Sequence, residues 1–292
     1  MRLEGIWPAL ATPLNADETV DRAALRRLVR RVLDGGVHGV VVLGSAGEFA
    51  ALADDAKSAA IETVVAEVAG QVPVIAGTGE PGTRRAVETT RTAARLGADA
   101  AMVVPPYYYG QPPDAVLRHY RALIELAGLP IVLYNIPGCT KVMLEQQGVA
   151  ELAQDPAVIG LKDSSGNFGF FSSVLAYRSE SFGVVTGSDR LLFASLMVGG
   201  DGSIGPTTNI APHWFVQLWD SVRAGRLDEA RDVQQKIAAL GQVYRPGGFH
   251  QGLKGALACL GVCSPIVSAP MVALDEDQMA QVKQTLVDLG LF

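Results

Sequence analysis

Short apolar runs alternate with longer helical segments along the first 225 residues of the chain. The run Val40-Val41-Val42-Leu43, for example, is apolar at every position. Runs of this kind are typical of parallel strands buried on both faces, and their alternation with helices indicates βαβ units. The pattern predicts eight strands, at residues 5–14, 39–45, 72–79, 100–106, 130–136, 158–165, 182–189 and 202–209.

A helical segment follows each predicted strand. These segments are residues 21–35, 54–70, 82–96, 112–127, 144–154, 168–177, 190–199 and 212–224. Asp21 is a plausible N-cap of the first. Eight strand–helix units in about 225 residues favour a (β/α)8 TIM barrel, which belongs to the α/β class. An open doubly wound sheet is the alternative, because periodicity does not show whether a sheet closes.

The rhythm changes after residue 224. Three helical stretches follow without a strand between them, at residues 227–242, 252–260 and 275–289. We therefore expect two parts, a barrel of residues 1–225 that carries the active site and a C-terminal three-helix extension of residues 226–292. The extension would cap the barrel or pack against other subunits.

Composition narrows the class of protein. Of the 292 residues, 49% are hydrophobic, which is ample for a large core, and the net charge is −6. No basic block is present, so we expect no binding to nucleic acid or to an acidic membrane surface. The three cysteines are too few and too irregularly spaced for a disulfide framework or a zinc site. Because neither a signal peptide nor a long apolar span is visible, we expect a cytoplasmic location.

Lys162 is the first candidate for chemistry, because it interrupts an apolar run that ends in small polar residues. A buried lysine is costly unless it is paired or its pKa falls. In barrels of this type the active site lies at the C-terminal ends of the strands. This position favours a nucleophilic amine, and the alternative is a structural lysine that pairs with Asp163 or Glu48.

Tyr134 occupies the corresponding position of the preceding strand. Side chains alternate with period two and adjacent strands lie about 4.8 Å apart, so Tyr134 and Lys162 can project into the barrel side by side. A phenol beside an amine suits imine chemistry, which needs groups that give and take protons. The alternative for Tyr134 is a core tyrosine with a satisfied hydroxyl.

Two further strand ends are unusual. Residues 44–48, Gly-Ser-Ala-Gly-Glu, form a turn whose N–H groups, with the Ser45 hydroxyl, could hold a carboxylate. The alternative is an ordinary turn between a strand and a helix. Residues 105–109, Pro-Pro-Tyr-Tyr-Tyr, place an aromatic cluster at another strand end, and the alternative there is a subunit interface.

Taken together, these motifs resemble the dihydrodipicolinate synthase/N-acetylneuraminate lyase family of class I, pyruvate-type aldolases. The motifs are Gly-Ser-Ala-Gly-Glu at 44–48, Pro-Tyr-Tyr at 106–108, Tyr-Asn-Ile-Pro-Gly at 134–138, Gly-Leu-Lys-Asp-Ser-Ser at 160–165 and Gly-Ser-Asp at 187–189. Their order and spacing match over essentially the whole chain. The resemblance implies a (β/α)8 barrel, a homotetramer built from two tight dimers, and no metal or organic cofactor.

The resemblance also implies roles for particular residues. Lys162 would form the imine with pyruvate or another 2-oxo acid, and Tyr134 would shuttle protons. Ser45 would link Tyr134 to Tyr108, which in the family reaches into the neighbouring subunit's site. The residues implied in substrate binding are Ala46, Gly187, Asp189, the backbone carbonyl of Ile204 and the residue at position 139.

Position 139 departs from the family. Synthases that make dihydrodipicolinate carry there an arginine that pairs with the carboxylate of the aldehyde, whereas this chain has Cys139. A thiol cannot replace a guanidinium that binds with two hydrogen bonds. Arg190 could supply the missing charge, or could simply begin a helix. The neutral site favours an aldehyde without a carboxylate.

Three functions therefore stay open. The leading prediction is a Schiff-base-forming lyase or aldolase that acts on a 2-oxo acid and an aldehyde. The second is a dehydratase/aldolase of 2-oxo-3-deoxy sugar acids, or a hydratase-aldolase, that uses the same imine. The third is a non-catalytic protein that binds 2-oxo acids.

Overall fold

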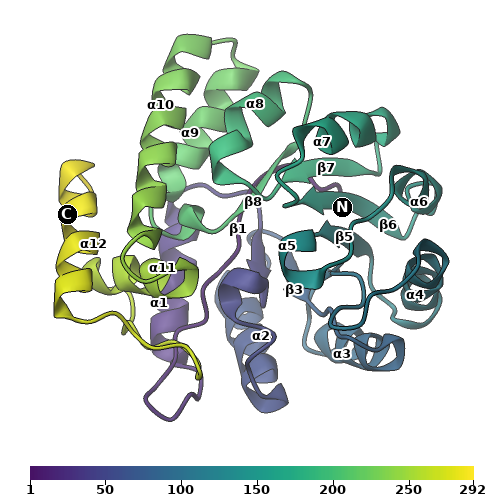
Figure 1. Cartoon of the computed structure of the whole chain (residues 1–292), viewed down its shortest axis with the longest axis horizontal. Coiled ribbons are helices and arrows are strands. Elements are labelled where there is room, and N and C mark those ends of the chain that lie inside the picture. The colour runs from purple at the N-terminus through teal and green to yellow at the C-terminus, as the bar shows by residue number, and fades with distance from the viewer.

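A computed structural model describes residues 1–292 and contains a single eight-stranded parallel sheet (Figure 1). The strands follow the order β1-β8-β7-β6-β5-β4-β3-β2. They are shorter than predicted, because the polar residues that end each run belong to the loops. Their bounds are β1 (Gly5–Pro8), β2 (Val40–Val42), β3 (Val74–Gly77), β4 (Ala100–Val103), β5 (Ile131–Asn135), β6 (Val158–Asp163), β7 (Gly183–Thr186) and β8 (Gly202–Gly205).

The sheet closes into a barrel between β1 and β2, the two ends of this order. Ala9, just after β1, forms a parallel bridge with Val41 of β2, and the N–H of Leu10 donates to the carbonyl of Val41 at 2.8 Å. β1 also pairs with β8 along its whole length. The predicted barrel is therefore confirmed, and the open doubly wound sheet is wrong.

Helices surround the barrel (Figure 1). The Asp21 side chain caps the first helix by accepting from the N–H of Ala24, as predicted. One extra turn, α5 (Pro137–Thr140), was not predicted, because four residues show no periodicity. The other helices are α1 (Arg22–Asp34), α2 (Asp54–Val68), α3 (Thr83–Arg95), α4 (Pro113–Leu126), α6 (Gln146–Leu152), α7 (Phe168–Val174), α8 (Leu192–Met197) and α9 (Pro212–Arg223).

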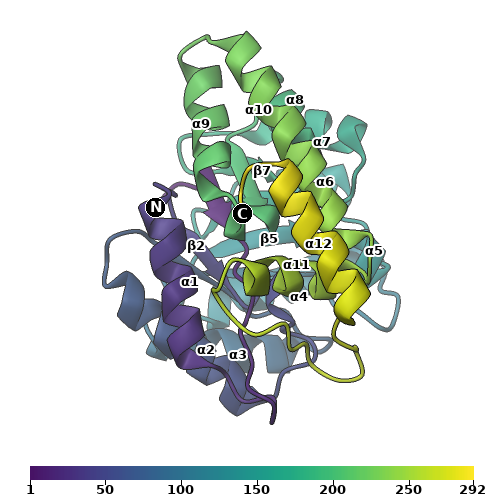
Figure 2. The same ribbon diagram turned by 90° about the vertical axis from the view of Figure 1, so that its left-hand side faces the viewer.

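The predicted C-terminal helices are present as α10 (Leu227–Leu240), α11 (Phe249–Cys259) and α12 (Glu276–Asp288). Figures 1 and 2 show that they lie together on one side of the barrel. Leu240 and Leu253 from these helices are fully buried in the same hydrophobic cluster as the barrel strands. The extension is thus packed into the barrel's core. No helix of the protein is long and apolar enough to span a membrane.

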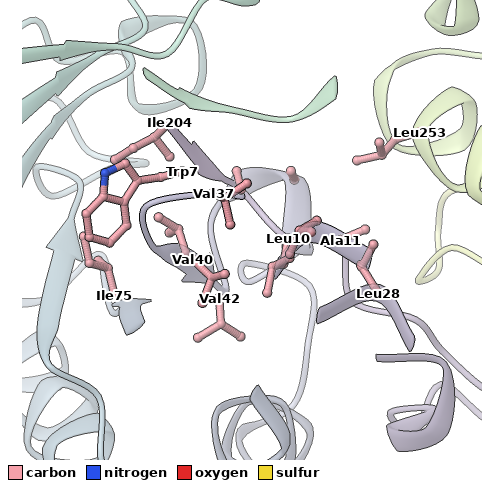
Figure 3. Packing of buried hydrophobic residues seen from close by; sticks show 14 of the residues in the cluster. Trp7, Leu10, Ala11, Leu28, Val37, Val40, Val42, Ile75, Ile204 and Leu253 are labelled. Carbon is pink, nitrogen blue, oxygen red and sulfur yellow. The ribbon is translucent and has the colours of Figure 1, made fainter. Parts of the chain in front are cut away.

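The barrel interior is tightly filled around Trp7, which is 1% exposed. Its ring lies near Ile75 and Ile204 (Figure 3). Gly39 is required by this packing, because a Cβ there would lie 2.0 Å from the indole ring. Close packing of this kind holds the strands in register, so it also determines where the residues at their ends lie.

Candidate active site

Strand register places the two main candidates opposite each other. Tyr134 of β5 pairs with Lys162 of β6, and the Lys162 Nζ atom lies 4.2 Å from the centroid of the Tyr134 ring. The two residues are only 4% and 3% exposed. The expectation that they project side by side is therefore confirmed.

The carboxylates that could have paired with Lys162 are engaged elsewhere. Asp163 accepts hydrogen bonds from the Asn135 side chain at 2.8 Å and from Ser165, and burial raises its pKa. Glu48 forms an ion pair with Lys254. Lys162 forms no ion pair, so the structural pairing that the sequence left open does not occur. Its amine is buried without a carboxylate partner.

Gly187 makes room for the Lys162 side chain. A Cβ at position 187 would lie 2.9 Å from the Lys162 Cε atom and 1.9 Å from the Ser164 hydroxyl oxygen. Real Cβ atoms do not approach other atoms so closely, so any side chain at this position would displace the lysine. The substrate contact expected of Gly187 stays a prediction.

The turn after β2 lies beside Tyr134. Residues Ser45–Gly47 form a single 3-10 turn, and the Ser45 hydroxyl is 3.4 Å from the Tyr134 hydroxyl. The first N–H groups of such a turn have no partner within it, which leaves those of Ser45 and Ala46 available to an anion. The structure therefore brings Ser45, Tyr134 and Lys162 together within one chain.

Tyr108 does not join this group. It is 81% exposed, and its backbone has a φ of 76°, which turns the side chain out beside Tyr109. Within one chain the predicted relay therefore stops at Ser45. Whether Tyr108 reaches a neighbouring site stays a prediction.

Asp189 and Ile204 lie at the ends of β7 and β8. The Asp189 Oδ2 atom accepts from both the N–H and the hydroxyl of Thr207, while Oδ1 is buried against Gly205. Burial raises the pKa of Asp189 to about 6, whereas the Thr207 hydrogen bonds and the charge of Lys162 act to lower it. Ile204 is fully buried. The substrate contacts expected of both residues stay predictions.

A cavity of about 220 Å³ opens beside Ser45, and we call it the Ser45 cavity. Phe49, Val104, Ile136 and Met271 supply much of its apolar lining, and Cys139 and His250 also line it. Arg190 does not line it. That residue is exposed, and its guanidinium lies beside Gly241 instead.

Two residues of α11 were missed by the sequence analysis. The His250 Nε2 atom lies 2.8 Å from the backbone carbonyl oxygen of Ser45, and since a carbonyl only accepts, Nε2–H is the donor. Lys254, 1% exposed, contacts the Glu48 carboxylate at 2.5 Å, and Ser268 donates to the same carboxylate. The one sequence feature that could have revealed this ion pair was the presence of a lysine, Lys254, within the apolar run 252–260. No group of three or more His, Cys, Asp or Glu side chains is arranged to hold a metal ion.

Comparison with known proteins decides the family. The family model described as "Dihydrodipicolinate synthetase family" matches residues 2–289. The chain belongs to this family. It is similar to 4-hydroxy-tetrahydrodipicolinate synthase of Magnetococcus marinus, with 34% identity over 288 residues, which are 99% of this chain and 98% of that protein. The same enzyme of Stenotrophomonas maltophilia is 43% identical over 224 residues, which cover 77% of this chain and 75% of that one.

Solved structures of the family superpose closely. YagE, a prophage protein from E. coli K12 solved in complex with pyruvate, has a TM-score of 0.95 at 31% identity, with 99% of both chains covered. Dihydrodipicolinate synthase from Thermotoga maritima has a TM-score of 0.95 at 29% identity, with 100% of both chains covered. The protein is thus an enzyme, a lyase of the class I aldolase type, and the resemblance drawn from its motifs is confirmed.

Proposed function

We propose that Lys162 forms an imine with the ketone carbon of pyruvate, and that the resulting enamine adds to an aldehyde. In the reverse direction, cleavage of the carbon–carbon bond frees the aldehyde and regenerates the enamine, and protonation and hydrolysis of the imine then release pyruvate. The observation that carries this proposal is the buried amine without a carboxylate partner, 4.2 Å from the Tyr134 ring. The pyruvate complex of YagE, a family member with the same fold, supports pyruvate as the 2-oxo acid.

The chemistry follows from the groups around the amine. Nucleophilic attack by the neutral amine of Lys162, followed by loss of water, gives the protonated imine, which serves as an electron sink. Loss of a proton from the adjacent carbon then gives the enamine. The Tyr134 hydroxyl would take and return that proton, an effect typically worth about 10²–10⁴-fold in rate.

Two further roles belong to this proposal. The N–H groups of Ser45 and Ala46, with the Ser45 hydroxyl 3.4 Å from Tyr134, would hold the pyruvate carboxylate. The exposed Tyr108 would complete the proton relay in the site of a neighbouring subunit, within a homotetramer made of two dimers. The cytoplasmic location expected from the sequence also stays a prediction.

Reduction with borohydride tests the imine directly. Intact protein treated with pyruvate and borohydride should gain about 72 Da, the mass of a reduced pyruvate adduct on a lysine that acts as a covalent nucleophile. Peptide mapping should place the adduct on Lys162. Lys162→Arg keeps the positive charge but cannot form an imine, so it should show no adduct.

Three outcomes would change the proposal. An adduct on another lysine, or none with any 2-oxo acid, would overturn it. An adduct only with longer 2-oxo acids would favour a dehydratase of sugar acids. Pyruvate binding by calorimetry without an adduct would favour a non-catalytic binding protein.

A further inference from the structure

An open depression lies between the C-terminal half of α1 and the first turn of α9, two helices on the same side of the molecule (Figure 2). It measures about 520 Å³, which is within the size range of small-molecule sites. Arg27, Arg30, Arg31 and His213 line it, and we call it the arginine depression. No residue of the candidate active site lines it, so the proposed imine chemistry does not account for it.

The sequence of α1 places the arginines of this depression on one side of the helix. Five of the residues in Arg22–Asp34 are arginines, and Asp34 is the only acidic one. Arg27, Arg30, Arg31 and Asp34 follow the spacing i, i+3, i+4 and i+7, so they share a face, while the apolar residues of the opposite face are buried. Like charges at this spacing repel each other. The face is therefore short of negative charge.

Nearby carboxylates neutralise these cations only in part. Arg30 shares the Glu67 carboxylate with Arg26, at distances of 2.5 and 3.8 Å. Arg27 and Arg31 form no ion pair, and donate instead to backbone carbonyls at 3.1 and 2.6 Å. These hydrogen bonds hold the two guanidinium groups in place and leave their charges unpaired. Fixed, unpaired guanidinium groups are suited to binding an anion.

The start of α9 adds to the positive potential. This helix begins at Pro212, and the first N–H groups of a helix have no partner within it, which favours an anion nearby. Partial burial lowers the pKa of His213, and the charges of Arg31 and Lys236 lower it further. Burial also lowers the pKa of Arg31. Both shifts indicate that positive charge here lacks a compensating anion.

The depression also offers a hydrogen-bond acceptor. The Asp34 side chain is exposed and forms neither a hydrogen bond nor an ion pair, so it is free to accept from hydroxyl groups. No phenylalanine, tyrosine or tryptophan lines the depression, so a nucleobase would find no such ring to stack on. The net charge of −6 opposes the approach of a long polyanion. These features favour a small, hydroxylated anion.

We infer that the arginine depression binds a sugar phosphate, a small phosphate monoester whose hydroxyl groups extend towards Asp34. Arg27, Arg30 and Arg31 would bind the phosphate oxygens, because the guanidinium fork matches phosphate geometry. The N–H groups at the start of α9 would add to this binding. The inference does not depend on the imine at Lys162 and involves no covalent step.

Calorimetry with the full-length protein at low salt tests the site, with glucose 6-phosphate as the probe. We expect one molecule to bind per chain. Arg27→Gln/Arg30→Gln should weaken binding by about tenfold, as loss of two exposed charge pairs implies. Arg84→Gln/Arg118→Gln removes the same charge from exposed positions on α3 and α4 and should leave the affinity unchanged. Absence of binding, or equal weakening in both double variants, would overturn the inference.

Comparison ligands define the chemical class at about pH 8, where both phosphates are dianions. Inorganic phosphate should bind about tenfold more weakly than glucose 6-phosphate, because it has no hydroxyl chain to reach Asp34. Asp34→Ala should remove this preference. Equal affinities in the natural protein would contradict a sugar phosphate and assign the depression to free phosphate. Tighter binding of a short DNA duplex, lost in Arg27→Gln/Arg30→Gln, would overturn the inference in favour of nucleic acid.

A second measurement uses the natural protein and needs no variant. Hydrogen–deuterium exchange at the C2 position of histidine, followed by mass spectrometry, gives the pKa of each histidine. Saturating glucose 6-phosphate should raise the pKa of His213, because a nearby dianion favours the protonated ring. His119 on α4, which is 2% exposed, should not respond. An unchanged pKa of His213 would show that the ligand binds elsewhere.

Discussion

Asp189 shows how burial at one residue adjusts the charge near Lys162. Its Oδ1 atom is buried without a hydrogen-bond partner, and a Cβ at Gly205 would lie 2.0 Å from that oxygen. Part of the residue reaches solvent, but the Oδ1 atom does not, and burial raises the pKa of the carboxyl group to about 6. The site therefore holds a carboxyl group that changes charge between mildly acidic and neutral pH.

This raised pKa predicts a specific pH dependence. The folded protein binds the Asp189 proton more tightly than the unfolded chain does, so the stabilisation is complete below about pH 4 and is lost as the pH rises through about 6. Asp189→Asn cannot ionise. Its free energy of unfolding, relative to the natural protein, should therefore rise by about 2–3 kcal/mol between pH 4 and pH 7.

Urea unfolding of both proteins at four pH values measures that difference. Asp232→Asn, at an exposed position on α10, is the matched control and should give a flat difference. Parallel profiles for Asp189→Asn and the natural protein would show that the carboxyl group has an ordinary pKa.

At the scale of elements, α11 supports the turn that carries Ser45. His250 holds the Ser45 carbonyl, and Lys254 holds Glu48 at the end of the same turn. Glu48 has a φ of 60°, in the left-handed region that a non-glycine residue adopts only when its surroundings hold it there. Burial lowers the pKa of Lys254, while the Glu48 carboxylate opposes that shift. The ion pair thus joins a C-terminal helix to the active-site turn.

We predict that replacing one partner of this ion pair destabilises the protein much more than replacing both partners does. Lys254→Met should lower the free energy of unfolding by about 3–5 kcal/mol, because it leaves the Glu48 charge buried and unpaired. The double variant Glu48→Gln/Lys254→Met should lose less than the sum of its single variants. Urea unfolding of the four proteins gives the coupling energy, and simple additivity would show that the pair is not coupled.

At the scale of the whole molecule, the barrel and the C-terminal helices share one hydrophobic core. Leu253, Leu257 and Leu286 are fully buried in the cluster that contains the first two strands. Removing residues 226–292 would expose this apolar surface and leave Glu48 without its cation. Although the sequence suggests a division after residue 225, the packing makes the parts interdependent.

We therefore expect a chain that ends at residue 225 to lack a cooperative thermal transition and to form no borohydride-reducible pyruvate adduct. Circular dichroism and intact mass measure the two properties. The full chain is the control. A truncated protein that melted cooperatively and formed the adduct would show that residues 226–292 are a dispensable extension.

The local pattern of apolar and polar residues was sufficient to predict most of the strands and helices of this protein. The eight continuous apolar runs indicate strands buried on both faces, and the segments between them and after residue 226 indicate helices. Each segment shows its own pattern by itself. Tyr134 and Lys162 could be paired because equivalent positions on adjacent parallel strands must face the same way. Barrel closure, by contrast, is a hydrogen bond between the segments after β1 and at β2, and no period encodes it.

The surroundings of the amine were decided by tertiary structure alone. His250 and Ser45 are 205 residues apart, and Glu48 meets Lys254 across a similar span of chain. The Ser45 cavity combines side chains from the β2, β4 and β5 loops with residues of the C-terminal region. The sequence by itself therefore determined the strand–helix units and the side-by-side placement of Tyr134 and Lys162. Only the packed molecule decided what pairs with each buried charge and what lines the space beside Ser45, because those contacts depend on which distant segments the closed barrel brings together.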